Sequence, residues 1–183
     1  GSGALTCILG TYVQPEGHIY SFDIRHKSLQ QAKHNVKKAN LEKVVTIQKG
    51  NILENDLGFQ DLDSIVLDLA QPWKAIKKVK PYLKLSGTLV SFSPTIEQIK
   101  KTYFALKQEG FFEIEACELL KRDFQIKQNA TRPRGRMIGH TGYLIFGRKI
   151  ADRENPYRGI KPENPEKVSF EGMPLGGYFE EDD

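Results

Sequence analysis

Residues 64–73 read S-I-V-L-D-L-A-Q-P-W, and the interpretation of the fold depends on this stretch. Residues 65–67 form a short apolar run of the kind found in buried strands. Asp68 follows the run, and Pro72 and Trp73 then open a basic segment that we predict to be helical. In an open α/β sheet, ligands bind beyond the carboxyl ends of the strands, where an acid beside an aromatic ring could meet a planar substrate. Asp also commonly caps a following segment, and these ten residues alone favour that structural role.

Predicted strands and helices alternate along most of the chain. Apolar spacing predicts strands at residues 18–23, 44–48, 64–69, 88–93, 111–120 and 141–146, and helices that end near Thr11, cover 28–40 and 73–83, and run from residue 96 to a stop at Gly110. This alternation is typical of an α/β fold with a parallel sheet. The last two strands follow each other without a helix, which predicts an antiparallel edge pair.

The composition is typical of a folded globular protein. The chain has 183 residues, 39% of them hydrophobic, which suffices for one domain with a core. We find no apolar run of membrane-spanning length and no signal peptide at the start. Cys7 and Cys117 lack the spacing of a metal site or a disulfide framework. We therefore expect a cytoplasmic protein without a membrane partner or a bound metal.

Charge is distributed unevenly along the chain. Residues 151–183 contain four Lys/Arg and nine Asp/Glu, which leaves 23 basic and 14 acidic side chains in residues 1–150. The net charges of the two segments are therefore −5 and +9. The basic body favours a polyanionic partner, although a lysine-rich solvated surface has the same composition. Because the acidic segment is rich in Pro and Gly and has no periodicity, we expect an extended or disordered extension there.

Two glycines, one residue apart, open the sequence G-S-G-A-L-T at residues 1–6. Such a turn before a helix lets the backbone approach a nucleotide closely, although a Gly-Ser cloning remnant would look the same. Asp23 ends a predicted strand about 20 residues further on, the separation at which an acid can accept ribose hydroxyl groups. The two signals together are stronger than either alone. Asn51 and Ile52 follow the next predicted strand, where an adenine ring could be held.

Four stretches, in order, make residues 1–149 resemble the tRNA adenine-N1 methyltransferases of the TrmI type, within the class I S-adenosylmethionine-dependent methyltransferases. G-S-G-A-L-T is similar to the methionine loop, and Asp23 stands in the place of the acid that binds the cofactor ribose. L-D-L-A-Q-P-W resembles the catalytic block D-x-x-x-P-W. R-P-R-G-R-M-I-G-H-T-G-Y-L, from Arg132, is similar to the block R-P-x-x-x-x-x-G-H-T-x-F/Y-L. The last two blocks are specific, since generic methyltransferases do not share them.

The resemblance implies an architecture and an assembly. Residues 1–150 would form a Rossmann-like catalytic domain with a mostly parallel sheet and an antiparallel edge pair. Residues 151–183 are not covered by it. The family places a small β domain and a first sheet strand ahead of the glycine loop, so we expect this chain to represent an N-terminally truncated domain. It further implies S-adenosylmethionine as the cofactor, tRNA as the partner and a homotetramer.

The resemblance also implies roles for individual residues. The catalytic residue would be Asp68, which would also lie beside the transferred methyl group. The cofactor would be bound by Gly1, Ser2, Gly3, Ala4, Leu5, Asp23, Ser28, Asn51, Ile52 and Asp68. The tRNA would be bound by Trp73, Phe92, Arg122, Arg132, Arg134 and Arg136. For Trp73, packing beneath the catalytic loop is the alternative role. We interpret His140 as a structural hydrogen-bonding residue outside catalysis.

One carboxylate suffices for the implied reaction. Adenine N1 is a neutral nucleophile, so methyl transfer needs orientation more than activation. An acceptor for the exocyclic amine would fix the ring and offset the positive charge that develops. The T-loop base must be extruded, at a cost of a few kcal/mol, which arginine contacts to phosphates would offset.

Two other functions fit parts of the sequence. A non-catalytic tRNA-binding subunit would share the fold, but the intact glycine loop, Asp23 and Asp68 argue against a degenerate site. A class I methyltransferase for a small molecule or a protein would share the cofactor residues. The charge of +9 and the arginine block argue against that alternative.

Overall fold

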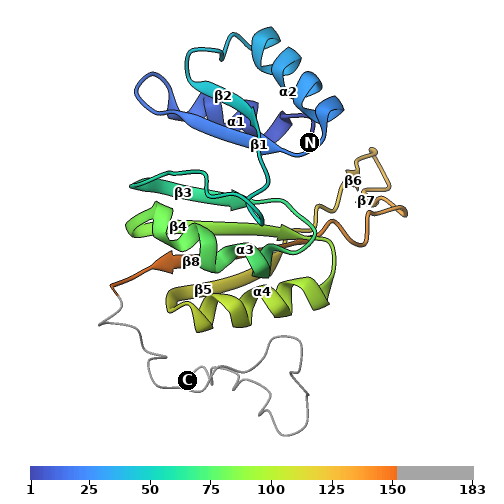
Figure 1. The fold of residues 1–183 in the computed structure, drawn as a ribbon. Coiled ribbons are helices and arrows are strands. Elements are labelled where there is room, and N and C mark those ends of the chain that lie inside the picture. Colours follow the sequence, from blue (N-terminus) through green and yellow to red (C-terminus); the bar gives the residue numbers. More distant parts are fainter. Residues whose placement is uncertain (152–183) are drawn as a thin grey trace, which may run out of the picture. The chain divides into compact units, whose positions relative to one another are not determined.

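The computed structural model describes residues 1–151, which form two compact units (Figure 1). The first is Gly1–Phe59, and the second begins at Gln60. The predicted acidic extension at residues 151–183 lies, apart from Ala151, outside the described residues. Within residues 1–151, no helix is long and apolar enough to cross a membrane.

The first unit pairs two parallel strands with two helices. Its elements are α1 (Ala4–Val13), β1 (Ile19–Asp23), α2 (His26–Lys38) and β2 (Val45–Lys49). β1 and β2 are in register from Ile19 opposite Val45 to Asp23 opposite Lys49. A small core forms where α2 and the turn after it meet β2, and it consists of Val36, Leu41, Val44 and Val45. The predicted elements of this segment are confirmed, with bounds that differ by one or two residues.

The second unit is built on a mixed four-stranded sheet with the order β3-β4-β8-β5. Its elements are β3 (Leu62–Leu67), α3 (Pro72–Val79), the 3-10 helix η1 (Lys80–Tyr82), β4 (Leu83–Ser93), α4 (Ile96–Gln108), β5 (Phe111–Glu118), β6 (Phe124–Gln125), β7 (Arg132–Pro133) and β8 (Tyr143–Lys149). β3 and β4 are parallel, whereas β8 runs antiparallel to both β4 and β5. The predicted α/β class and the antiparallel pair are therefore confirmed. In addition, β8 lies inside the sheet, between β4 and the edge strand β5.

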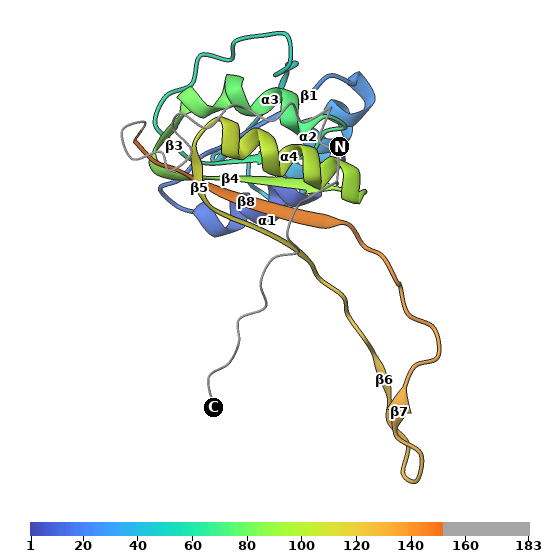
Figure 2. The same cartoon turned by 90° about the horizontal axis from the view of Figure 1, so that it is seen from below.

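Two helices supply the core of the second unit. α3 and α4 pack against each other, and α4 also packs on β4, β5 and β8 (Figures 1 and 2). Ile76 of α3, Leu106 of α4, and Leu89 and Ile145 of the sheet are fully buried. Helix α4 begins with a capping box, in which the Thr95 hydroxyl accepts from the Gln98 backbone N–H and the Gln98 side chain accepts from that of Thr95.

Three predictions for this unit were inaccurate. Of the apolar run at residues 65–67, only Leu67 is buried, while Val66 remains 38% exposed. Among the described residues, β3 is an edge strand that pairs with β4 alone. The predicted helix 73–83 ends at Val79, just before Pro81, and β4 begins at Leu83 rather than at residue 88. The short strands β6 and β7 were not predicted, because two-residue strands carry no detectable alternation.

Residues 119–142 form a hairpin that we call the arm. Figure 2 shows that β6 and β7 lie far out along it, beyond the ends of β5 and β8. The two strands pair antiparallel, with Phe124 opposite Pro133. The backbone N–H of Arg134 donates to the Asp123 carbonyl at 2.8 Å. The arm therefore projects from the end of the sheet at which β5 stops and β8 begins.

Candidate functional site

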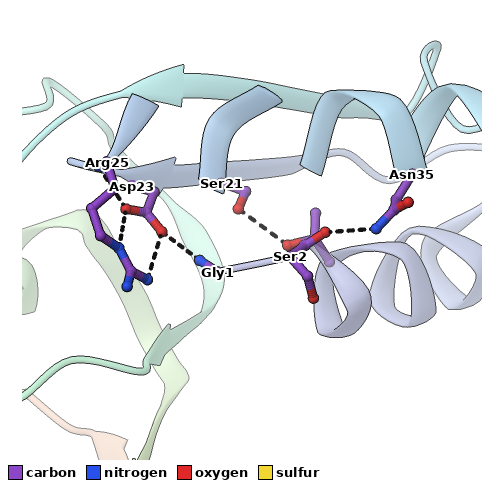
Figure 3. A network of polar contacts seen from close by, with 7 residues as sticks. Gly1, Ser2, Ser21, Asp23, Arg25 and Asn35 are labelled. Carbon is purple, nitrogen blue, oxygen red and sulfur yellow. Dashed lines mark hydrogen bonds and ion pairs between the residues drawn. The ribbon is translucent and has the colours of Figure 1, made fainter. Parts of the chain in front are cut away.

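The carboxyl end of β1 presents a carboxylate held by several donors (Figure 3). Asp23 Oδ1 accepts from the backbone N–H of Arg25 at 2.8 Å, and the Gly1 amino group contacts Oδ2. The Arg25 guanidinium lies 3.4 Å from Oδ1 and 3.5 Å from Oδ2. Partial burial raises the pKa of Asp23, but the hydrogen bonds from Gly1 and Arg25 outweigh it and hold the pKa well below its ordinary range. Asp23 is thus an anionic acceptor at neutral pH.

The opening glycine turn is fixed against both β1 and α2. The Asn35 side-chain amide donates to the Ser2 carbonyl at 3.0 Å, as Figure 3 shows. The hydroxyls of Thr6 and Ser21 lie 3.1 Å apart. Gly3 has φ +79°, and a Cβ built on it would lie 2.9 Å from the Ala32 Cβ. Only glycine fits this turn, because it combines a left-handed conformation with a close approach to α2.

Helix α1 begins directly after this turn and leaves its first N–H groups without a side-chain cap. Gly3 is the N-cap residue and has no side chain to accept them. Ala4 and Leu5, in the first turn, are exposed. Free N–H groups at a helix N-terminus, together with the positive end of its dipole, favour an anionic ligand group such as a carboxylate.

The segment after β2 lies next to Asp23. The Gly50 N–H donates to the Asp23 carbonyl at 3.3 Å, and a Cβ at Gly50 would lie 2.9 Å from the Phe22 ring. Asn51 and Ile52 follow and are half-buried. The Asn51 side-chain oxygen accepts from the Leu53 N–H at 3.1 Å, so it shapes its own turn.

Apart from Asp68, which lies in the second unit, the predicted cofactor residues gather on one end of the first unit. They come from the glycine turn with the start of α1, from the end of β1, and from the segment after β2. Ser28 lies in the first turn of α2 and is half-buried. This set of groups is chemically suitable for S-adenosylmethionine. It offers a carboxylate for hydroxyl groups, free N–H donors for an anionic group and half-buried apolar surface for a ring.

In the second unit, Asp68 follows β3 directly and is exposed. Leu67 pairs with Ser91 of β4, so Asp68 and Phe92 come one residue beyond the same register position on neighbouring parallel strands. The loop after Asp68 is held by the Gln98 side chain, whose amide donates to the Ala70 carbonyl at 3.0 Å. A carboxylate and an aromatic ring are thus brought to the same end of the sheet.

Phe92 lies within β4, one residue before the strand ends at Ser93. Its side chain is 36% exposed. The returning end of the arm passes close to the ring, since a Cβ on Gly142 would lie 2.3 Å from Phe92 Cε2. Gly142 has φ +125°, so both its conformation and the space around it require glycine.

Trp73 is half-buried in the first turn of α3. The Lys101 ammonium of α4 lies 5.2 Å from the centre of its ring. The Trp73 indole Nε1 is buried and has no hydrogen-bond partner within residues 1–151. These contacts favour a packing role for Trp73 over an open stacking surface.

All four predicted tRNA-binding arginines lie on the arm. Arg132 is in β7, and Arg122, Arg134 and Arg136 lie in the connecting segments; all four are exposed. The arm therefore carries all four arginines, which are far from Asp68 and Phe92 in the sequence. Glu118, Pro94 and Gln98 carry no recognisable motif in the sequence, but the structure links the first two to His140 and Gln98 to the loop after Asp68. Only the G-H-T block pointed to this region.

The family assignment comes from comparison with known proteins. Residues 1–132 match the model of a family described as the tRNA methyltransferase complex GCD14 subunit. The chain belongs to this family. The resemblance stated from the sequence motifs is therefore confirmed.

Similar proteins support the same assignment. The tRNA (adenine(57)-N(1)/adenine(58)-N(1))-methyltransferase TrmI of Methanocaldococcus jannaschii is 34% identical, over 81% of this chain and 61% of its own length. A crystal structure of tRNA (m1A58) methyltransferase TrmI from Aquifex aeolicus has a TM-score of 0.74 and 28% identity, covering 82% of this chain and 60% of that one. A SAM-dependent O-methyltransferase from Thermotoga maritima has a TM-score of 0.80 and 33% identity, covering 84% and 58%. The class I methyltransferase fold is thus confirmed, and the chain spans about three-fifths of the length of these relatives.

Proposed function

We propose that this chain carries the catalytic part of an S-adenosylmethionine-dependent methyltransferase that modifies N1 of adenosine in the tRNA T-loop. Position 58 is the proposed target, with the neighbouring position 57 as a second one, as in the name of the archaeal relative. The observation that carries the proposal is the placement of Asp68, in its L-D-L-A-Q-P-W block, beside Phe92 at the carboxyl ends of two parallel strands.

The residues of the first unit fit the cofactor. Asp23 would accept the ribose hydroxyls, Asn51 and Ile52 would border the adenine, and the N–H groups of Ala4 and Leu5 would face the methionine carboxylate. Gly1, Ser2 and Gly3 would line the methionine portion through their backbone, and Ser28 would contribute from α2. When bound, S-adenosylmethionine supplies a methyl group carried on a positively charged sulfur.

Asp68 would orient the target base. Its carboxylate would accept a hydrogen bond from the exocyclic amine, which fixes N1 toward the methyl group and offsets the positive charge that forms on the ring. Phe92 would stack on the extruded base, and Asp68 would also border the cofactor. The ring contacts of Trp73 favour its packing role, so stacking on tRNA is the weaker part of this proposal.

The arm would bind the tRNA backbone. Six basic side chains and one acid, Asp123, lie on residues 119–142, and the four arginines among them present fixed charges suited to phosphates. The arm also exposes large apolar side chains, including Phe124 at 57%, Ile126 at 82% and Ile138 at 72%. A neighbouring subunit in a cytoplasmic homotetramer, the assembly that we propose from family resemblance, would cover them.

Asp68→Asn tests the catalytic role, with Asp63→Asn as the matched control. Both acids are exposed, but Asp68 follows β3, whereas Asp63 lies near the start of that strand and pairs with Lys84. We expect Asp68→Asn to slow single-turnover methyl transfer by about 10²–10³-fold with tRNA affinity unchanged, and the control to keep its rate. Mapping methylated bases in unmodified tRNA identifies the position. If wild-type protein binds tRNA but transfers no methyl group, the chain is instead a non-catalytic subunit.

The arginines are tested by salt dependence. In the triple change to Ala of Arg132, Arg134 and Arg136, the slope of log affinity against log salt should fall by up to about one unit per lost phosphate contact. The control replaces Lys33, Lys37 and Lys38, exposed basic residues on α2. If the salt slope fell equally in both triple variants, tRNA binding would depend on the basic surface as a whole and not specifically on the arm.

A further inference from the structure

His140 joins three segments of the second unit through both nitrogens of its ring. Nδ1 lies 2.9 Å from Glu118 Oε1 at the end of β5, and Nε2 lies 2.7 Å from the Pro94 carbonyl after β4. A carbonyl oxygen and a carboxylate both accept hydrogen bonds. A neutral imidazole can donate from only one nitrogen, so both bonds form together only when the ring is doubly protonated.

These contacts close the base of the arm. The Thr141 hydroxyl donates to the Leu119 carbonyl at 3.0 Å, which ties the returning strand of the arm to the outgoing one. The Thr141 N–H also approaches Glu118 Oε1, at 3.4 Å. The Tyr143 ring, on β8, lies 5.0 Å from the His140 ring. Among the described residues, Glu118 and Tyr143 are the titratable groups that these contacts place against His140.

From Pro94, the peptide bond to Thr95 and then two hydrogen bonds lead to the loop that follows Asp68. The next residue, Thr95, forms the capping box of α4 with Gln98. The Gln98 side chain accepts from the Thr95 N–H at 3.1 Å and donates to the Ala70 carbonyl at 3.0 Å. The position of Pro94 therefore affects the residue that holds the Asp68 loop.

We propose that doubly protonated His140 is a positioning residue for methyl transfer, because it fixes Pro94 and, through the α4 capping box, the loop that carries Asp68. The inference rests on the proposed function, since it takes Asp68 as the catalytic residue. The G-H-T block, which contains His140, would then contribute to the reaction as well as to the stability of the fold.

Protonation gives this arrangement a pH dependence with a definite sign. The hydrogen bond to Glu118, followed by that to the Pro94 carbonyl, raises the pKa of His140 above its ordinary value of 6.5. The paired contacts are therefore complete below pH 6.5 and are lost as the pH rises through the raised pKa of the folded protein. Single-turnover methyl transfer should decrease as the pH rises through this pKa.

Glu118→Gln tests whether the contacts of His140 matter apart from its protonation, because this variant can keep both contacts with a neutral ring. The glutamine amide can donate to Nδ1 of a neutral ring, whose Nε2–H still donates to Pro94, and its oxygen can accept from a protonated ring. We expect this variant to keep the wild-type rate with a flat pH profile. His140→Ala should slow single-turnover transfer about 10- to 100-fold, with tRNA affinity unchanged. His34→Ala, which removes an exposed histidine of α2, is the control and should match wild type.

Two NMR measurements on the same proteins test the inference without activity. The His140 ring should titrate above pH 6.5 in wild type and lower in Glu118→Gln. The Gln98 side-chain amide protons should exchange with solvent more slowly in wild type than in His140→Ala. A ring that titrates at or below its ordinary value, equal exchange, or a Glu118→Gln profile identical to wild type would overturn the proposal. If wild type methylates no tRNA while the NMR results hold, the proposed function fails and the His140 contacts stand.

Discussion

At Gly3, in the first unit, a single added methyl group should have a large effect on stability. Gly3 has φ +79°, and an added Cβ would lie 2.9 Å from the Ala32 Cβ and 3.0 Å from the Ala32 Cα. The second contact is with the backbone of α2, so relief requires a shift of the helix. Gly58 offers a matched control, because it also has positive φ, +68°, but no atom within 4 Å of a built Cβ.

The expected costs follow from these two geometries. A non-glycine residue in the left-handed conformation costs about 1–2 kcal/mol, which applies to both Gly3→Ala and Gly58→Ala. Forcing an extra methyl group into a packed contact adds about 1–3 kcal/mol at Gly3 alone. Both variants gain about 0.4–1 kcal/mol from a less flexible unfolded chain, and this gain cancels in the comparison. Gly3→Ala should therefore be destabilised by about 1–3 kcal/mol more than Gly58→Ala.

Urea unfolding followed by circular dichroism measures both variants, and amide hydrogen exchange locates the change. We expect faster exchange in α2 of Gly3→Ala, and weaker binding of S-adenosylmethionine by titration calorimetry. Gly58→Ala should bind as wild type does. Equal stabilities for the two variants, or an undisturbed α2 in Gly3→Ala, would refute the argument that the glycine turn is fixed by its contact with Ala32.

Three further outcomes follow from single side chains. Asp23→Asn should destabilise the protein at neutral pH, but the difference from wild type should shrink as the pH falls below 3.8, because the lowered pKa of Asp23 stabilises the fold only where the carboxylate is charged. The prediction would be contradicted if the urea-unfolding free energies of wild type and Asp23→Asn differed by the same amount at neutral pH and below pH 3.8. Gly142→Ala should cost about 1–3 kcal/mol and displace the Phe92 ring, which a crystal structure or aromatic NMR shifts would detect; unchanged shifts would count against it. Leu106→Ala, in the core of α4, should cost about 2–5 kcal/mol in thermal or urea unfolding, whereas Ile96→Ala, 62% exposed, should cost little, and similar losses would contradict the assigned core.

Patterns within short segments predicted most of the secondary structure. Leu29, Ala32 and Val36 are spaced for one face of a helix, and these are the residues that α2 buries. Gly110 was predicted to stop a helix, and α4 ends two residues before it. Such signals are reliable because the spacing of apolar residues and the conformational preference of glycine act within one element.

Burial was predicted less well, because it depends on neighbours that a segment does not contain. Val66 has the apolar neighbours of a buried strand residue, yet it is 38% exposed on the edge strand β3. The arm escaped detection for a related reason. Its strands contain two residues each and are held together by backbone hydrogen bonds, which leave no side-chain pattern in the sequence.

The sequence by itself was enough to single out the residues that we propose for the chemistry. Gly3, Asp23 and Asp68 are recognisable because a left-handed turn and an acid at a strand end need particular residue types at particular places. The tertiary structure decided which residues distant in the sequence contact one another around the proposed site. By inserting β8 between β4 and β5, the fold brings His140 to Glu118 and Pro94, 22 and 46 residues away. No local pattern specifies such contacts, because they arise from pairing between strands whose backbone groups are chemically alike.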